Sequence, residues 1–170
     1  RSVGVTTTAA VTAGGALKID GHKTTAAGYQ GINLNSAVKG ASVAITGDTI
    51  GHYGVAVGAS GSVESTVGDV TIIGTGTGNT SMGAGNQTNG VRLEGAVTAK
   101  NKLSITGTVN GAGGYQGVLV YKALTGNSID IKGTSNAWDG IHFANNGSVT
   151  SATTLVIDAD STAVGKGILF

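Results

Sequence analysis

Carboxylate and imidazole side chains are the first residues to consider for chemistry, because enzymes that cleave polysaccharides need several of them converging on one face. The chain of 170 residues has nine acidic side chains. They are Asp20, Asp48, Glu64, Asp69, Glu94, Asp130, Asp139, Asp158 and Asp160. In the repeat described below they scatter over all three faces, so we expect no active site and no enzymatic activity. Lys132 lies between Asp130 and Asp158 in that repeat, which predicts a surface ion pair.

Metal binding is not expected either. The histidines His22, His52 and His142 fall at different positions of the repeat, and we expect no carboxylate in register with any of them. Asp158 and Asp160 could share a cation, but two carboxylates without a turn glycine make a poor calcium motif. The absence of cysteine excludes disulfides and thiolate metal sites. The sequence therefore predicts no metal and no cofactor.

Aromatic rings are the second candidate chemistry, since an exposed ring can pack against the apolar face of a sugar. Tyr29, Tyr115 and Trp138 each stand two residues before a glycine, and Gly-Tyr-Gln-Gly occurs at 28–31 and again at 114–117. A polar residue follows each ring, namely Gln30, Gln116 and Asp139. We predict that these six residues form a shallow ligand-binding groove. The alternative is that the rings only cover the apolar edge of a corner.

A short phrase, apolar–variable–isoleucine, occurs six times along the chain. The strands that it predicts would set the positions of the candidate ring and polar residues. Its copies begin 26, 27, 33, 26 and 26 residues apart, and such a near-constant period indicates a repeat architecture. The alternation points both apolar side chains of each copy to one side of a strand. The isoleucines are therefore predicted to stack in one core column, formed by Ile19, Ile45, Ile72, Ile105, Ile131 and Ile157.

Two further phrases keep step with the first. Glycine followed by apolar–variable–apolar begins at Gly31, Gly54, Gly90, Gly117, Gly140 and Gly167, and its phase predicts that Phe143 and Phe170 are core residues. A single apolar residue then recurs at Val38, Val63, Val97, Leu124 and Val149. Each period thus contains three short strands. We call the isoleucine phrase the A strand, the glycine phrase the B strand and the single apolar position the C strand.

These phrases predict an all-β fold, a right-handed parallel β-helix (a β-solenoid) of about six rungs. A three-residue strand is not stable alone, but it can pair with its copies in the rungs above and below. A β-sandwich also uses short strands and glycine-rich turns, yet it gives no reason for isoleucine at the same phase six times. A leucine-rich repeat would need an Asn/Cys ladder and a helical segment, which are missing.

Residues 1–170 are expected to form one such segment. The chain begins and ends in a B phrase, which predicts a fragment of a longer rod without caps. Nearly all length variation falls between the A and B strands, and the longest excursion spans residues 74–89. Repeat proteins often place a binding face at such insertions. Three glycosylation triplets occur, at Asn79, Asn86 and Asn146, and their modification is an open question.

Composition limits the class of partner. Thirty-one residues are glycine, and lysines and arginines outnumber acidic residues by only one. A nucleic-acid-binding protein would be expected to show a basic stripe, and none is visible. No apolar run approaches the length of about 18 residues that a membrane span requires.

The repeats resemble those of filamentous-haemagglutinin-type bacterial exoproteins, the adhesins of two-partner secretion and their contact-dependent-inhibition relatives. The resemblance rests on the tandem phrases at 31–35, 102–120 and 128–158 and extends over essentially the whole chain. It implies a right-handed β-helical rod that is exported through an outer-membrane pore transporter and is displayed at the bacterial surface or secreted.

The function expected from this resemblance is adhesion, in which a rod segment contacts a host glycan or protein receptor. A passive stalk of a large exoprotein, with no binding site in this segment, is the structural alternative. A polysaccharide-degrading β-helix enzyme is a third possibility, and the scattered carboxylates argue against it.

Overall fold

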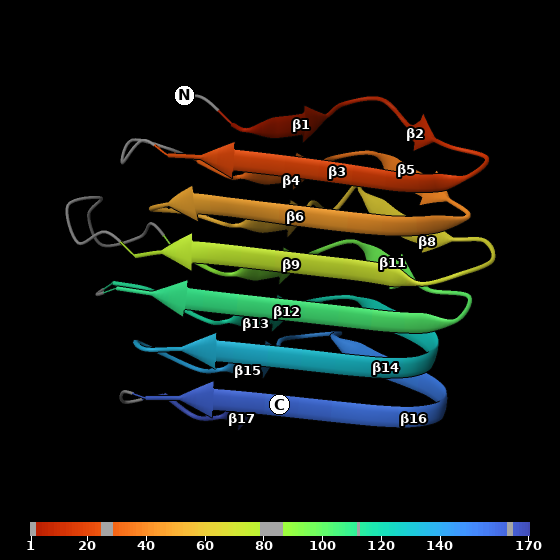
Figure 1. Cartoon of the computed structure of the whole chain (residues 1–170). Helices are drawn as coiled ribbons and strands as arrows, with labels where there is room; N and C mark the ends of the chain where they lie inside the picture. The colour runs from red at the N-terminus through yellow and green to blue at the C-terminus, as the bar shows by residue number, and fades with distance from the viewer. Residues whose placement is uncertain (1–2, 25–28, 79–86, 112, 163–164) are drawn as a thin grey trace.

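The computed structural model describes residues 3–24, 29–78, 87–111, 113–162 and 165–170. These residues form strands, turns and bends without a helix, and they wind into a parallel β-solenoid of about six turns (Figure 1). Followed from β1 to β17, the chain descends as a right-handed coil. Within the described ranges, no helix is long and apolar enough to cross a membrane. The predicted fold class is confirmed.

The B phrases form a seven-stranded parallel sheet, one strand for each passage of the chain. Each strand follows a phrase glycine, and successive strands pair without a register shift. The strands are β1 (Val5–Thr7), β4 (Ile32–Leu34), β7 (Val55–Val57), β10 (Val91–Leu93), β13 (Val118–Val120), β15 (Ile141–Phe143) and β17 (Ile168–Leu169). We call this the B sheet.

The A and C strands together form a second parallel sheet of ten strands. The C strands are β2 (Val11–Thr12), β5 (Ala37–Gly40), β8 (Ser62–Ser65) and β11 (Ala96–Thr98), and the A strands are β3 (Ala16–Lys23), β6 (Ser42–Ile50), β9 (Val70–Thr77) and β12 (Lys102–Asn110). In the last two turns the C and A strands are continuous, as β14 (Ala123–Ser135) and β16 (Ser148–Ser161). The A strands are longer than the three-residue phrases that predicted them.

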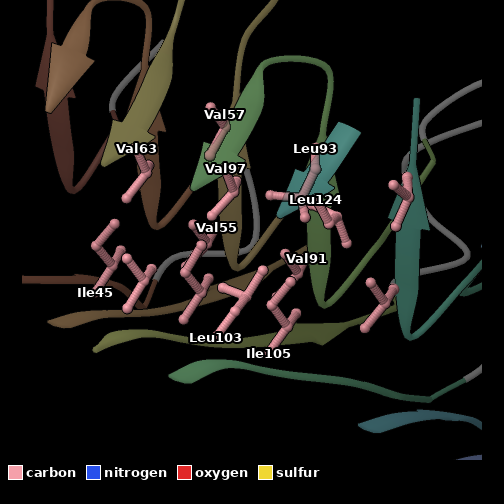
Figure 2. Close-up of a cluster of buried hydrophobic side chains, with 14 of the residues drawn as sticks. Ile45, Val55, Val57, Val63, Val91, Leu93, Val97, Leu103, Ile105 and Leu124 are labelled. Atoms are coloured by element: carbon pink, nitrogen blue, oxygen red, sulfur yellow. The ribbon is translucent and has the colours of Figure 1, made fainter. Parts of the chain in front are cut away.

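The predicted isoleucine column is confirmed along its whole length. Each isoleucine of the A strands pairs in register with the isoleucine of the next turn. Ile45, Ile72, Ile105 and Ile131 are at most 1 % exposed, while Ile19 and Ile157, in the outer turns, are partly buried. Valines and leucines of the B and C strands close the core from the other two sides (Figure 2).

A column of glycines extends the A strands beyond the isoleucines and meets the phrase glycines of the B sheet. A Cβ built on Gly107 would lie 2.1 Å from the carbonyl oxygen of Gly117, and one on Gly47 would lie 2.3 Å from that of Gly54. The same contact recurs between Gly21 and Gly31, Gly74 and Gly90, and Gly133 and Gly140. We call this contact the glycine seam. It brings the two sheets so close together that no side chain fits between their backbones.

One expectation about a core residue needs correction. Phe143 is buried in the core as predicted, but Phe170 is 83 % exposed, because it follows β17, which is paired on one side only among the described strands. Its ring lies flat against Phe143, with centroids 5.1 Å apart.

The excursion predicted at 74–89 begins later than expected, since β9 continues to Thr77. Residues 79–86, with the triplet asparagines Asn79 and Asn86, lie outside the described residues. Asn146, in the third triplet, is exposed in the turn after β15.

Replacing Ile105 by Asp should lower the free energy of unfolding by more than about 4 kcal/mol, because it buries an unpaired carboxylate between two paired turns. The control is Thr106→Asp, one residue along the same strand and facing outward, which should be nearly neutral. Thermal melting of both variants measures the difference. Equal losses in the two would mean that the inward and outward faces of β12 are assigned wrongly.

The glycine seam gives a second stability prediction. Gly107→Ala should cost at least about 2 kcal/mol of unfolding free energy, because the added methyl group would overlap a backbone oxygen that cannot move without shifting a strand. Gly14→Ala is the matched control, since nothing lies within 4 Å of a Cβ there. Chemical denaturation should leave the Gly14 variant at or slightly above wild-type stability. A Gly107 variant as stable as the control would contradict a close-packed seam.

Candidate functional site

The predicted ring residues lie at the corner where each A strand turns into the B sheet, and hydroxyl groups hold their backbones there. Thr49 Oγ1 donates to the carbonyl oxygen of Tyr29 at 2.8 Å. The equivalent hydrogen bond recurs in later turns. Ser135 Oγ donates to the Tyr115 carbonyl at 2.5 Å, and Ser161 Oγ donates to the Trp138 carbonyl at 2.7 Å. Thr49 is the last residue but one of β6, and Ser135 and Ser161 end β14 and β16, so the end of each strand is coupled to a ring position.

The structure brings two of the three predicted rings together. Tyr115 and Trp138 are stacked, with centroids 5.6 Å apart and planes inclined by 17°. Trp138 is 50 % exposed, so one part of the indole faces solvent. Tyr29 lies elsewhere, against His52 at 5.5 Å, because the intervening turns carry His52 and Thr88 at the ring position. The predicted line of three rings is therefore two separate groups.

The polar residues that follow the rings are less open than the sequence suggested. Gln30 is half-buried, but Gln116 is 6 % exposed and Asp139 is 4 % exposed. Gln116 Oε1 accepts a hydrogen bond from Asn89 Nδ2 at 2.9 Å, so this oxygen already has a partner inside the corner. A ligand at the surface would meet the rings more readily than the Gln116 amide.

Asp139 is held differently from Gln116. Its Oδ1 accepts the backbone N–H of Lys166 at 2.9 Å, whereas the buried Oδ2 has no hydrogen-bond partner. Nδ1 of His142 lies 3.9 Å from Oδ2, and this buried nitrogen also lacks a hydrogen bond. Sequence reasoning missed His142 as a neighbour because the two residues are joined by the bend that opens β15.

A hollow of about 230 Å³ adjoins these groups. It is lined by Trp138, Asp139, Gly165, Lys166 and Leu169. A larger, open trough of about 650 Å³ runs along the junction of the C and A strands. We favour the smaller hollow as the candidate site, because the trough has no ring in its lining and its one carboxylate, Glu64, is already paired with Lys39 at 2.8 Å.

A second cluster surrounds Arg92 on the outer face of the B sheet, and sequence reasoning did not find it. The guanidinium contacts Glu94 Oε1 through Nε at 3.0 Å and through Nη2 at 2.5 Å, and it donates from Nη1 to the Tyr53 hydroxyl at 3.0 Å. The same Nη1 donates to Gln87 Oε1 at 2.8 Å, and the rings of Tyr53 and Tyr121 lie 5.0 and 5.2 Å from the guanidinium carbon.

The arginine side chain is 17 % exposed and lies between Ala56 and Leu119, its register neighbours, which are buried although they face outward. Its N–H groups therefore donate to side chains of this chain. We interpret Arg92, Glu94, Tyr53, Gln87 and Tyr121 as a structural clamp rather than a ligand site. In the sequence, the feature that could have pointed to this cluster is that Arg92 and His142 occupy the same outward position of the B phrase.

Burial and charge shift the pKa values around this clamp. Burial lowers the pKa of His52 and the charge of Arg92 lowers it further, so the imidazole is neutral at pH 7. Burial also raises the pKa of the Tyr53 hydroxyl, which stays protonated. For Arg92, burial alone would lower the pKa, but the hydrogen bond to Glu94 and the nearby Tyr53 outweigh it and raise the pKa. The Arg92 guanidinium therefore stays protonated within the clamp.

One histidine expectation was wrong. His22 Nδ1 contacts Asp48 Oδ1, and the two residues are register partners on β3 and β6. The pair is exposed, at 60 % and 44 % of the side-chain surface. Within the part of the chain that the structure describes, no three His, Cys, Asp or Glu side chains converge to hold a metal ion.

The surface ion pair expected around Lys132 is confirmed. Lys132 Nζ lies 3.0 Å from Asp158, and a similar pair joins Lys102 and Asp130 at 3.2 Å, one turn earlier.

Compared with protein-family models, with curated proteins and with solved structures, the chain matches none. The resemblance to filamentous-haemagglutinin-type repeats therefore remains a prediction from the sequence, and function has to be argued from the corner itself.

Replacing Arg92 by Met should lower the free energy of unfolding by about 1.5 to 3 kcal/mol, because the charge-assisted hydrogen bonds to Glu94 are lost and a half-buried carboxylate is left unpaired. Lys132→Met removes an exposed ion pair and should leave the melting temperature unchanged. Urea unfolding of both variants tests the clamp. An unfolding free energy equal to that of the wild type in both variants would show that the Arg92 cluster contributes nothing to stability.

Proposed function

We propose that this chain is a β-helical rod segment of a bacterial surface or secreted adhesin, and that it contacts a glycan through the Tyr115–Trp138 pair. The observation that carries the proposal is the half-exposed Trp138 ring, stacked on Tyr115 beside an apolar hollow. Several large apolar side chains of the rod are exposed, and Trp138 is the one among them that lines this hollow. Indole faces pack well against the apolar faces of sugar rings.

The architecture suits weak binding of this kind. A single shallow site with one ring pair gives low affinity, because little of the ligand is buried. Many copies of the parent protein on one cell would act together, and linked weak contacts raise the overall avidity by orders of magnitude. Export through an outer-membrane pore transporter and display toward a host receptor are part of this proposal, and they are supported by the resemblance of the repeats.

A passive stalk is the second candidate, and one observation favours it. The outer face of the A strands carries ion pairs that link Lys102 with Asp130 and Lys132 with Asp158 from one turn to the next. The hollow that opens beside Lys132 and Asp158 has no aromatic side chain in its lining. Such a face needs no ligand to be stable. Under this alternative, the segment sets the distance between the cell and a more distal domain.

Binding experiments separate the two candidates. The double variant Tyr115→Ala/Trp138→Ala should reduce retention of the chain on a glycan panel at least about tenfold, which corresponds to about 1.4 kcal/mol. Tyr29→Ala is the matched control, because this ring is removed from the pair and should change retention little. Circular dichroism and thermal melting establish that both variants are folded.

The same variants should be displayed on cells in the full-length parent protein. Adherence should fall with the double variant and persist with Tyr29→Ala. If folded protein lacking both rings supports unchanged adherence and unchanged retention, the segment is a stalk and the receptor site lies elsewhere.

A further inference from the structure

Asparagine followed by glycine is a chemically reactive dipeptide, because the glycine nitrogen can attack the side-chain amide of the asparagine. Glycine has no Cβ to shield this nitrogen or to restrict the backbone around it. The chain contains the dipeptide three times, at Asn89–Gly90, Asn110–Gly111 and Asn146–Gly147. All three pairs carry the same reacting groups, so we expect the fold to determine which of them reacts.

Asn89 is protected by burial and by hydrogen bonds. It is 0 % exposed, and its Nδ2 donates to Gln116 Oε1 at 2.9 Å and to the Gln116 carbonyl oxygen at 3.4 Å. The Gly90 N–H donates to the same carbonyl oxygen at 3.3 Å. Gly90 also belongs to the glycine seam, where a Cβ would lie 2.3 Å from the Thr108 nitrogen. The attacking nitrogen and the amide can therefore meet only if the corner opens between two paired turns.

Asn110 is exposed, but its backbone is held in a strand. It is the last residue of β12, it pairs in register with Thr77, and its carbonyl oxygen accepts the Gly78 N–H at 2.6 Å. These contacts keep the backbone of Asn110 extended. Ring closure requires the Asn110–Gly111 peptide plane to rotate until its nitrogen faces the side chain, so the parallel ladder slows the reaction here.

Asn146 has neither form of protection. It is exposed in the turn between β15 and β16, and its neighbour Asn145 has a φ of 54°, a strained conformation for a residue other than glycine. One hydrogen bond closes this turn, from the Gly147 N–H to the Ala144 carbonyl oxygen at 2.9 Å. A hydrogen bond of this kind at an exposed turn opens at low free-energy cost, which frees the Gly147 nitrogen.

We propose that Asn146 is a site of spontaneous deamidation in the folded chain. The Gly147 nitrogen forms a bond to Asn146 Cγ, base takes its proton, and the Cγ–Nδ2 bond breaks with release of ammonia. The product is a cyclic succinimide. Water then opens one of the two carbonyl–nitrogen bonds of the ring, which gives aspartate or isoaspartate and adds a negative charge to the turn.

This modification is independent of the proposed function. The turn at Asn146 leads from the B sheet into the continuous C and A strand β16, whereas the Tyr115–Trp138 pair lies where the A strands enter the B sheet. Failure of either proposal therefore leaves the other untouched.

The test incubates chain 1–170 in neutral buffer at physiological temperature, with and without a denaturing concentration of guanidinium chloride. Peptide mapping by mass spectrometry measures asparagine, aspartate and isoaspartate at all three positions. In buffer, Asn146 should convert at least about tenfold faster than Asn89, and faster than Asn110, because protection follows the free energy of local opening. In denaturant the three rates should converge.

Asn146→Gln is the control variant, because the longer side chain would have to close a larger ring. It should remove conversion at this position only and leave the melting temperature unchanged. If Asn89 or Asn110 converts as fast as Asn146 in buffer, or if Asn146 converts only in denaturant, the proposal is overturned. A rate difference that persists in denaturant would overturn the role of the fold. Product with aspartate but no isoaspartate would indicate direct hydrolysis and overturn the succinimide route.

Discussion

Close contact between two glycine columns sets the cross-section of this solenoid. At Gly107 and at Gly74 a Cβ would lie 2.1 Å from a carbonyl oxygen of the facing strand, a distance that no side chain tolerates. The A strands and the B sheet therefore converge to a wedge at this side, and the isoleucine and valine columns fill the wider part of the section. The seam also fixes where each turn bends, because the phrase glycine is the residue at which the chain enters the B sheet.

The candidate site depends on that bend. Trp138 and Asp139 directly precede Gly140, and Tyr115 and Gln116 directly precede Gly117, so the closeness of the seam determines how far each ring and each polar group stands from the next turn. Backbone hydrogen bonds from Gly117 to Asp139 and from Gly140 to Lys166 join these positions into a column. Ring stacking and the hollow beside Trp138 are thus consequences of backbone spacing, to which the side chains have adapted.

Much of the fold could be predicted because inward positions repeat. Ile105 recurs as isoleucine in five other turns, and its phase gave the strands, their parallel pairing and their register. Outward positions vary in residue type from turn to turn. His22 and Asp48 each stand three residues after a column isoleucine, so their contact could have been read from the period and was overlooked. The clamp of Arg92 could not, because it depends on how far side chains from different turns and from the corner reach. The glycines of the A strands are present in the sequence, but their role could not be predicted from it, because it depends on how closely the B sheet approaches them in the folded chain.

Parallel pairing between turns has a mechanical consequence. The backbone hydrogen bonds of both sheets join each turn to the next, so they point along the stack, and a pull applied at its two ends loads the turns in series. The interface with the weakest ladder yields first, and the others remain closed. A repeat of 26 residues, fully extended, would add about 90 Å of slack each time a turn peels away. A rod built in this way lengthens in steps under tension, and each step dissipates energy while the remaining turns stay folded.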